Sequence, residues 1–178
     1  MIRITGGKHR SRKLVTPETS LTKPTMDKVR AGVFNALGNH LEGKKVLDLF
    51  CGSGSYGFEA ISRGASFVTF VDQTKFSKDA VLANAEALHE KDLEFVFSEA
   101  LSYINETEKK FDLIFMDPPY KLDIIENVLS VIEKRALLNK DGAIVVESEH
   151  EISFNETYKD VRHYVYGLAH VYLLRKYI

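Results

Sequence analysis

The sequence has very little cysteine and no tryptophan. Cys51 is the single cysteine among 178 residues. One thiol cannot form an internal disulfide, so the cross-linked frameworks of small secreted proteins are excluded. This composition is typical of proteins in a reducing compartment, and we expect a cytoplasmic location. The six histidines are scattered without the spacing of metal ligands, so we expect no metal site.

Long apolar runs are also missing. No run approaches the ~20 residues that a membrane-spanning helix needs, and the N-terminus has no signal-peptide core. We therefore expect no membrane partner. With 44% hydrophobic and 28% charged residues, the composition is that of an ordinary globular protein. The length predicts a single compact domain, and we expect a monomer.

The small net charge conceals an uneven distribution. Residues 1–30 contain eight Lys or Arg against two acidic residues, so this segment is +6 and the remainder is -7. A basic segment on an acidic body predicts contact with a polyanion, with a solvated tail as the alternative. Alternation over 1–5, the turn at Gly6-Gly7 and a return strand over 11–15 predict a basic hairpin. We divide the chain into this extension, 1–24, and a main domain, 25–178.

Alternating strands and helices follow. A first helix is expected from Thr25 or Asp27, both capable N-caps, to Gly38 or Gly43. Short apolar strands are predicted at 46–50, 67–71, 93–97, 111–116 and 143–146. Helices are predicted between them at 56–63, 76–89, 100–107 and 124–138. This order predicts an α/β fold with a mostly parallel sheet and helices on both faces. Residues 161–167 and 169–177 alternate like a final antiparallel pair.

A glycine-rich loop joins the first of these strands to its helix. Gly52, Gly54 and Gly57 match GxGxxG, a pattern that lets a nucleotide approach the backbone but is not specific by itself. Asp48, at the end of the strand, would repel a dinucleotide pyrophosphate and attract a cation such as the ammonium of S-adenosylmethionine. We therefore predict S-adenosylmethionine rather than NAD, with a hydride-transfer enzyme as the alternative. The loop residues assigned to this cofactor are Phe50, Gly52, Ser53 and Gly54.

Other acidic residues follow neighbouring strands. Asp72 ends the second strand, where a carboxylate can bind both ribose hydroxyls. Glu99-Ala100 follows the third strand, where Glu99 would accept from the adenine amine. Asp117 follows the fourth. Because parallel strands end at one edge of a sheet, we expect these side chains to share a single site, although each alone also suits a turn or a helix cap.

The turn after the fourth strand has the composition of an amine-binding corner. Asp117 offers acceptor oxygens and Tyr120 an aromatic face, while Pro118 and Pro119 remove backbone donors and stiffen the turn. An exocyclic NH2 group needs acceptors and a ring to stack on. An ordinary turn is the alternative. Cys51 lies in the cofactor loop rather than at this turn, so we interpret it as a small packing residue and not as a nucleophile.

With these motifs placed, the chain resembles class I methyltransferases, which have a Rossmann-like seven-stranded sheet ending in an antiparallel hairpin. Within them it resembles the RsmD family, bacterial 16S rRNA (guanine-N2) methyltransferases. The resemblance covers essentially the whole chain and is most specific in two N-terminal stretches. These are residues 3–8 and the Pro-Thr-Met-Asp-Lys-Val-Arg of 24–30. Three departures are Ser11, Lys23 and the pair 98–99, where the family more often has glycine, arginine and Gly-Asp.

The resemblance implies methyl transfer to N2 of a guanine, position 966 of 16S rRNA in this family. It implies that Asp117 and the Pro118 carbonyl orient the amine while Tyr120 stacks on a base extruded from its helix. Basic residues would hold the RNA: Arg10, Arg12, Lys13 and Arg30, the last with a rival place over the cofactor. The expected partner is 16S rRNA within a small ribosomal subunit or an assembly intermediate. The alternatives are N6-adenine methylation, protein glutamine methylation and a non-catalytic RNA-binding assembly factor.

Overall fold

The computed structural model describes residues 1–16, 25–38, 40–119, 122–154, 157–158 and 160–175. The strands are β1 (Ile2–Arg3), β2 (Lys13–Leu14), β3 (Lys45–Leu49), β4 (Phe67–Asp72), β5 (Leu93–Phe97), β6 (Phe111–Met116), β7 (Leu138–Ser148), β8 (Asp160–Tyr166) and β9 (Ala169–Arg175). The helices are α1 (Thr25–Leu37), α2 (Ser55–Ser62), α3 (Lys75–Leu88), α4 (Ala100–Glu106) and α5 (Leu122–Lys134). None of the helices that the structure describes is long and apolar enough to cross a membrane.

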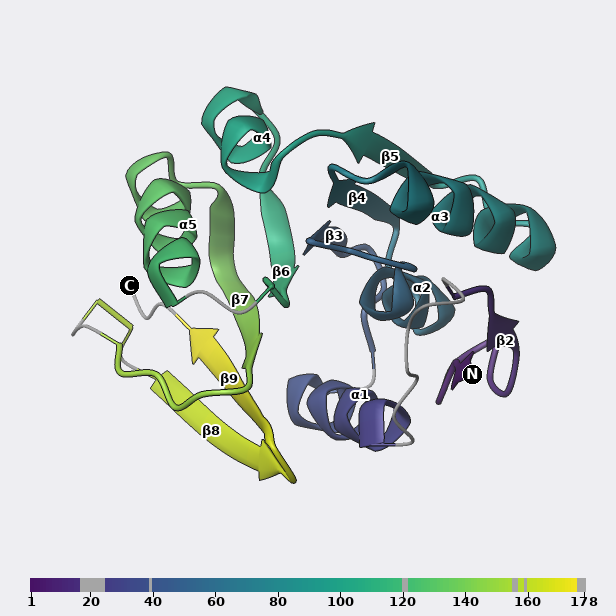
Figure 1. The fold of residues 1–178 in the computed structure, drawn as a ribbon, viewed down its shortest axis with the longest axis horizontal. Coiled ribbons are helices and arrows are strands. Elements are labelled where there is room, and N and C mark those ends of the chain that lie inside the picture. The colour runs from purple at the N-terminus through teal and green to yellow at the C-terminus, as the bar shows by residue number, and fades with distance from the viewer. Residues whose placement is uncertain (17–24, 39, 120–121, 155–156, 159, 176–178) are drawn as a thin grey trace.

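A mixed sheet forms the centre of the molecule (Figure 1). Its seven strands run in the order β5-β4-β3-β6-β7-β9-β8. The pairs from β5 to β7 are parallel, and β9 is antiparallel to both β7 and β8. The predicted α/β class, the mostly parallel sheet and the C-terminal antiparallel hairpin are therefore confirmed.

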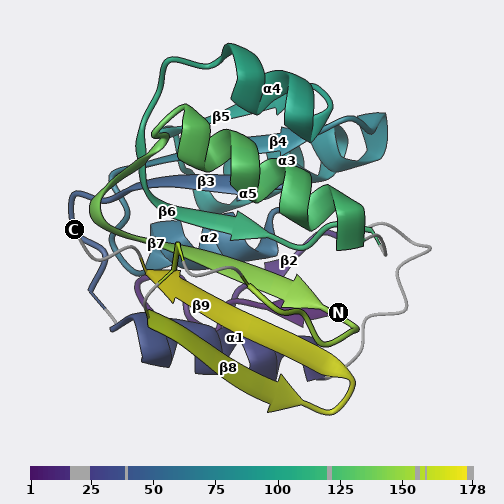
Figure 2. The ribbon, with the colours of Figure 1, turned by 90° about the vertical axis from the view of Figure 1, so that its left-hand side faces the viewer.

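Helices cover both faces of the sheet because the central strands are apolar on both sides. Successive strand residues point to opposite faces. Val46 accordingly packs in the core beneath α1, α2 and α3, whereas its neighbour Leu47 packs in the core beneath α4 and α5. Figure 2 shows α4 and α5 in front of the sheet and α1 and α2 behind it.

The N-terminal hairpin is shorter than predicted. Only Ile2–Arg3 and Lys13–Leu14 pair as strands. The backbone of the turn between them is hydrogen-bonded to helix α2. Lys8 donates its N–H to the Ser62 carbonyl at 2.8 Å, and Ser62 Oγ accepts from the His9 N–H. The strands end where the next N–H groups bond elsewhere: the Thr5 N–H donates to Glu59, and the Val15 N–H donates to Asn84.

The last helix ends earlier than predicted. The helix expected over 124–138 stops at Lys134, and the strand expected over 143–146 is extended to Leu138–Ser148. Ala136 adopts a left-handed φ of 51°, and the Leu137 N–H bonds back to the Ile132 carbonyl, which closes the helix without a glycine. Since Ala is an unusual residue in this conformation, the sequence carried no signal for the boundary.

Candidate functional site

The order in which the chain adds strands to the sheet reverses between β3 and β6. These two strands are neighbours although β4 and β5 lie between them in the sequence. Ligands of open α/β sheets bind beyond the strand ends at such a switch point. Asp48 lies opposite Phe115 in the β3–β6 register, so Asp117 follows two residues further along the adjacent strand. Both side chains belong to the face covered by α1 and α2. The structure thus brings Asp48 and Asp117 to one rim.

Asp48 is buried, with 3% of its surface exposed. Its Oδ2 accepts from the Gly57 N–H at 2.9 Å, which ties the first turn of α2 to the end of β3. Burial raises the pKa of Asp48 to about 8; the Gly57 hydrogen bond opposes this shift and the charge of Asp72 adds to it. In the part of the chain that the structure describes, Asp48 forms no ion pair. A buried carboxyl that forms no ion pair among these residues is suited to binding a cationic ligand.

The three glycines of the loop, Gly52, Gly54 and Gly57, are suited to their positions for different physical reasons. Gly52 has a φ of 53°, and a Cβ there would point into open space. A Cβ on Gly54 would come within 2.8 Å of the Phe70 ring, and one on Gly57 within 2.2 Å of it. Gly54 and Gly57 therefore permit close packing of α2 on β4, while Gly52 leaves a cradle beside the backbone for a ligand.

Asp72 connects the glycine loop to the end of β4. Its Oδ2 accepts from the Gly52 N–H at 3.0 Å, and its Oδ1 accepts from the N–H and hydroxyl of Thr74. The half-buried Asp72 thus orients the loop as well as offering its oxygens to the rim. On the other side of the loop, the buried Asn84 donates to the carbonyls of Ser53 and Val15. That clamp was not predicted, because its partners are 31 and 69 residues away.

Asp117 opens the turn after β6. Asp117 is an exposed residue, and desolvation by the surrounding protein together with the charges of Glu147, Asp48 and Glu149 raises its pKa well above the ordinary value. Pro118 is buried and Pro119 exposed, so the turn is anchored by its first proline. The predicted stacking residue Tyr120 lies outside the described residues.

A second carboxyl beside Asp117 was missed in the sequence. Glu147 follows Val146, which is opposite Met116 in the β6–β7 register, so Glu147 and Asp117 are neighbours on adjacent strands. Its Oε2 accepts from the hydroxyl of Tyr56 at 2.7 Å. Burial raises the pKa of Glu147, opposed by this hydrogen bond and by the charge of Arg30. The strand-end rule used for the other acids also applies to Glu147 and would have found it.

The Tyr56 ring is held in an aromatic stack. Its centroid lies 4.8 Å from that of Phe115 and 6.5 Å from that of Phe34, with interplanar angles of 23° and 28°. Packing on both sides leaves Tyr56 only 9% exposed. The hydroxyl is consequently a fixed donor that sets the position of Glu147.

Two residues near the rim have local structural roles. Glu99 is the N-cap of α4, where its Oε2 accepts from the Ser102 N–H at 3.1 Å, and Ala100 is buried in the first turn. The predicted contact of Glu99 with the adenine amine stays a prediction. Cys51 is 8% exposed, and burial raises the pKa of its thiol further above the ordinary value. The Cys51 thiol therefore has the properties of a packing residue and not of a nucleophile.

Arg30 is buried in the core, with 1% of its surface exposed. Its Nε lies 3.3 Å from Glu59 Oε2, and its Nη2 donates to Asp27 Oδ1 and to the Arg3 carbonyl. Buried Glu59 also binds Arg63 and accepts from the backbone N–H groups of residues 5 and 6. Arg30 has no surface to offer a phosphate here, so the placement of Arg30 among the RNA contacts does not agree with the structure.

The other predicted RNA contacts remain at the surface. Arg10, Arg12 and Lys13 are exposed, and Arg12 donates to the Ala87 carbonyl in the last turn of α3. Lys8 pairs with Glu90 just beyond that helix. The tip of the hairpin therefore lies at the C-terminal end of α3, whereas the rim lies at its N-terminal end. The return strand leads back toward the rim, because Val15 is bonded to Asn84, which also donates to the Ser53 carbonyl of the glycine loop.

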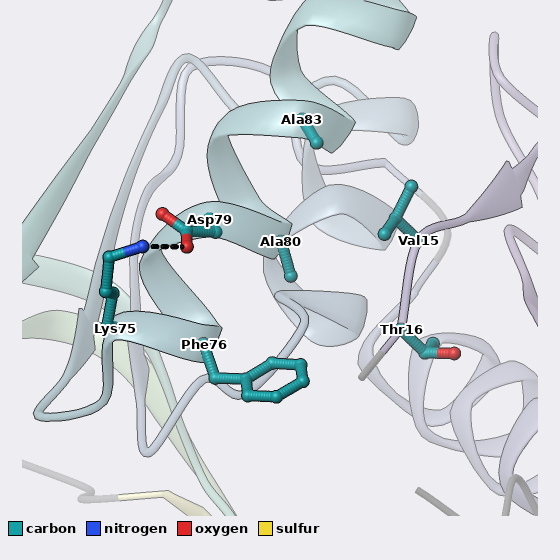
Figure 3. Close-up of a pocket in the computed structure, with 7 residues that line it drawn as sticks. All are labelled: Val15, Thr16, Lys75, Phe76, Asp79, Ala80 and Ala83. Carbon is teal, nitrogen blue, oxygen red and sulfur yellow. Dashed lines mark hydrogen bonds and ion pairs between the residues drawn. The ribbon is translucent and has the colours of Figure 1, made fainter. Parts of the chain in front are cut away.

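A pocket of about 480 Å³ lies between α3 and residues 15–16 (Figure 3). Val15 and Thr16 form one wall and Phe76 and Ala80 the other, while Lys75 pairs with Asp79 at its margin. None of the rim carboxyls lines this pocket. It is adjacent to the site rather than part of it.

The rim fits the predicted cofactor by its donor set and shape. It combines a buried carboxyl at Asp48, an acidic strand end at Asp72 and an open backbone cradle at Gly52. Carboxyls complement the positive charges of S-adenosylmethionine and would repel a pyrophosphate. Among the described residues, no group of three or more His, Cys, Asp or Glu is arranged to hold a metal ion.

Comparison with known proteins gives consistent relatives. A family model described as "Conserved hypothetical protein 95" matches residues 2–175. The Bacillus subtilis protein YlbH is 35% identical over 98% of this chain and 99% of its own length. Ribosomal RNA small subunit methyltransferase D of Escherichia coli is 33% identical over 84% of this chain and 76% of its own length. The solved structure of yhhF from Escherichia coli superposes with a TM-score of 0.88 at 31% identity, over 98% of this chain and 97% of that one.

Proposed function

The chain belongs to the RsmD family, the family described as Conserved hypothetical protein 95, and from this membership we propose that it is an S-adenosylmethionine-dependent rRNA methyltransferase. We further propose that it methylates the exocyclic N2 of a guanine in 16S rRNA, at the position that corresponds to 966. Its substrate would be a small ribosomal subunit or an assembly intermediate in the cytoplasm, and the enzyme would act as a monomer without a metal.

One observation supports this proposal above the others. The carboxyls of Asp48 and Asp117 share one rim at the point where the strand order reverses, with the glycine loop on one side and the Asp-Pro-Pro turn on the other. A cofactor held by the loop and an amine held by the turn would be neighbours. Positioning of this kind can lower the activation barrier by ~7–11 kcal/mol, so the reaction would not depend on a strong base.

We assign the cofactor to residues at the ends of β3, β4 and β5. Asp48 would pair with the ammonium group of the cofactor, Asp72 would bind the ribose hydroxyls, and Glu99 and Ala100 would border the adenine. The open side of Gly52 supports backbone contact along the loop of Phe50, Ser53 and Gly54. When bound, the cofactor supplies an electrophilic methyl group, whose bond to sulfur breaks and leaves S-adenosylhomocysteine.

Asp117 would orient the nucleophile. The lone pair of a guanine amine is delocalised into its ring, so the amine needs acceptors that draw it toward a pyramidal geometry. Asp117 and the Pro118 carbonyl provide those acceptors. As the new N–C bond forms, the amine loses a proton, and Asp117 would accept it. Tyr120 would stack on the extruded base.

The exposed basic hairpin would contact the RNA backbone through Arg10, Arg12 and Lys13. Because the hairpin tip lies beside the C-terminal end of α3 and the rim beside its N-terminal end, the substrate would extend well beyond the modified base. A folded ribonucleoprotein particle presents phosphates over such a span. We therefore favour a particle over a short free strand.

The test is methylation of small-subunit particles with labelled cofactor, followed by mapping of the modified nucleotide. Wild type is expected to label one guanine at N2, and Asp117→Ala to lose transfer by at least ~100-fold while RNA binding is largely kept. A label on adenine N6 would overturn the choice of base. RNA binding without any transfer by wild type would indicate an assembly factor, and a thermal shift with NAD but not with S-adenosylhomocysteine would indicate hydride transfer.

A further inference from the structure

Glu147 is a carboxyl at the rim to which the chemistry above assigns no role. It is half-buried at the end of β7, on the same face as Asp117 and one strand away from it. Neighbouring strands are ~4.8 Å apart, so the two side chains start at about that spacing. Since desolvation and the charge of Glu147 both raise the pKa of Asp117, the pair favours a guest that brings hydrogen-bond donors to both.

The position of Glu147 is fixed more firmly than a strand end requires. The Tyr56 hydroxyl donates to Oε2 at 2.7 Å, and the Tyr56 ring is packed against Phe115. A carboxylate has about four acceptor sites on its two oxygens, so one such bond leaves most of its capacity for a ligand. Arg30 partly compensates the charge of Glu147 without occupying the rim, because its guanidinium is bound by Glu59 and Asp27.

The chemistry of the purine edge gives this second carboxyl a use. Beside the N2 amine of guanine stands N1–H, a donor. Beside the N6 amine of adenine stands N1 with a lone pair, an acceptor. A carboxylate next to the amine-binding corner would therefore accept from guanine and repel adenine. A site discriminates most strongly between two bases when the wrong base would leave a buried polar group of the site without a hydrogen-bond partner.

We propose that Glu147 is a specificity-determining residue that accepts the N1–H of the target guanine while Asp117 accepts from its N2 amine. This inference rests on the proposed function and adds the basis for the choice of base. Tyr56 is a positioning residue, which acts through Glu147 and does not contact the base.

The experiment compares two target RNAs that differ only at the modified base, guanine or 2-aminopurine. Both bases carry the N2 amine, but N1 of 2-aminopurine is an acceptor. The missing O6 of 2-aminopurine affects all enzyme variants alike, so it cancels when the guanine preference of two variants is compared. The variants are Glu147→Gln, Tyr56→Phe and, as a control for loss of one carboxylate, Glu151→Gln at an exposed position.

Wild type is expected to prefer guanine by ~10- to 100-fold in kcat/KM, the range for a hydrogen bond to a charged group. Glu147→Gln should lose at least about tenfold of that preference, because its amide can donate to the N1 of 2-aminopurine. Tyr56→Phe should lose part of it, and Glu151→Gln should keep it. Thermal unfolding of each variant separates a folding defect from a change of preference.

An unchanged preference in Glu147→Gln, with transfer to both RNAs reduced equally, would mean that Glu147 is structural and would overturn this inference while the proposed function stands. If Glu147→Gln does not fold, an unchanged preference in Tyr56→Phe overturns it in the same way. Wild type that methylates adenine in preference to guanine would overturn both the inference and the proposed function.

Discussion

Asp48 gives a prediction in which stability and cofactor binding change in opposite directions. The substitution Asp48→Asn keeps an oxygen that can accept from the Gly57 N–H but removes the titrating carboxyl. Burial raises the pKa of Asp48 from 3.8 to about 8, so the folded protein holds this proton more tightly than the unfolded chain does. The stability that this proton binding contributes is full below pH ~4 and is lost as the pH rises toward 8.

The expected magnitude follows from that window. Between the two pKa values the folded state binds about one proton more, so Asp48 lowers the free energy of unfolding by about 1.4 kcal/mol per pH unit. From about pH 5.5 to about pH 7.5 the loss is about 2.5 kcal/mol, since Asp48 begins to ionise in the fold near the upper limit. Asp48→Asn should lack this loss and should be increasingly more stable than wild type as the pH rises.

Urea unfolding of both proteins at the two pH values measures this difference. Asp79→Asn, at an exposed helix position, is the control for loss of an acidic residue and should follow wild type. S-adenosylhomocysteine binding should weaken at least about tenfold in Asp48→Asn, because the ammonium group of the ligand loses a buried counter-charge. A stability difference between Asp48→Asn and wild type that stays constant with pH would refute the reasoning, since Asp48 would then be ionised throughout.

Two further predictions concern the N-terminal segment. Glu59→Gln removes the buried carboxylate that Arg30 and Arg63 share and should lower the free energy of unfolding by roughly 3–5 kcal/mol, against little change for the exposed Glu86→Gln. Equal effects of the two substitutions in urea unfolding would contradict this. Replacing the exposed Arg10 and Lys13 together by alanine should reduce the slope of log RNA affinity against log salt by roughly 0.7 for each phosphate that the hairpin no longer neutralises. The control Lys110→Ala should leave the slope unchanged. A binding titration in which neither variant alters the slope would show that the hairpin does not contact the RNA.

The parallel sheet and the position of the rim were readable from local patterns. Short apolar strands alternating with helices have few solutions other than a covered parallel sheet. In such a sheet all strands end at one edge, so the order of the sequence already placed Asp48, Asp72 and Asp117 together. The same rule applied to residue 147 would have added Glu147, which was passed over because the fifth strand carries no turn motif after it.

Other features depend on partners that are distant in sequence. Arg30 occupies a basic position of an amphipathic helix, where local pattern predicts a solvent-facing charge. Its burial is decided by Glu59, 29 residues away, which also fixes the hairpin backbone. Distant partners also shorten the strands β1 and β2, because Glu59 accepts from the Thr5 N–H and Asn84 accepts from the Val15 N–H.

The sequence by itself determined the type of sheet, the edge at which the acidic strand ends gather and the stiffness of the turn after β6. Each of these follows from residue order, since strand direction and the stiffness of adjacent prolines are local properties. Only the tertiary structure decided which cations are exposed, how far the hairpin lies from the rim, and that Tyr56 holds Glu147 beside Asp117. Those are properties of contacts between separate elements, and the free energy that selects them arises when the elements pack.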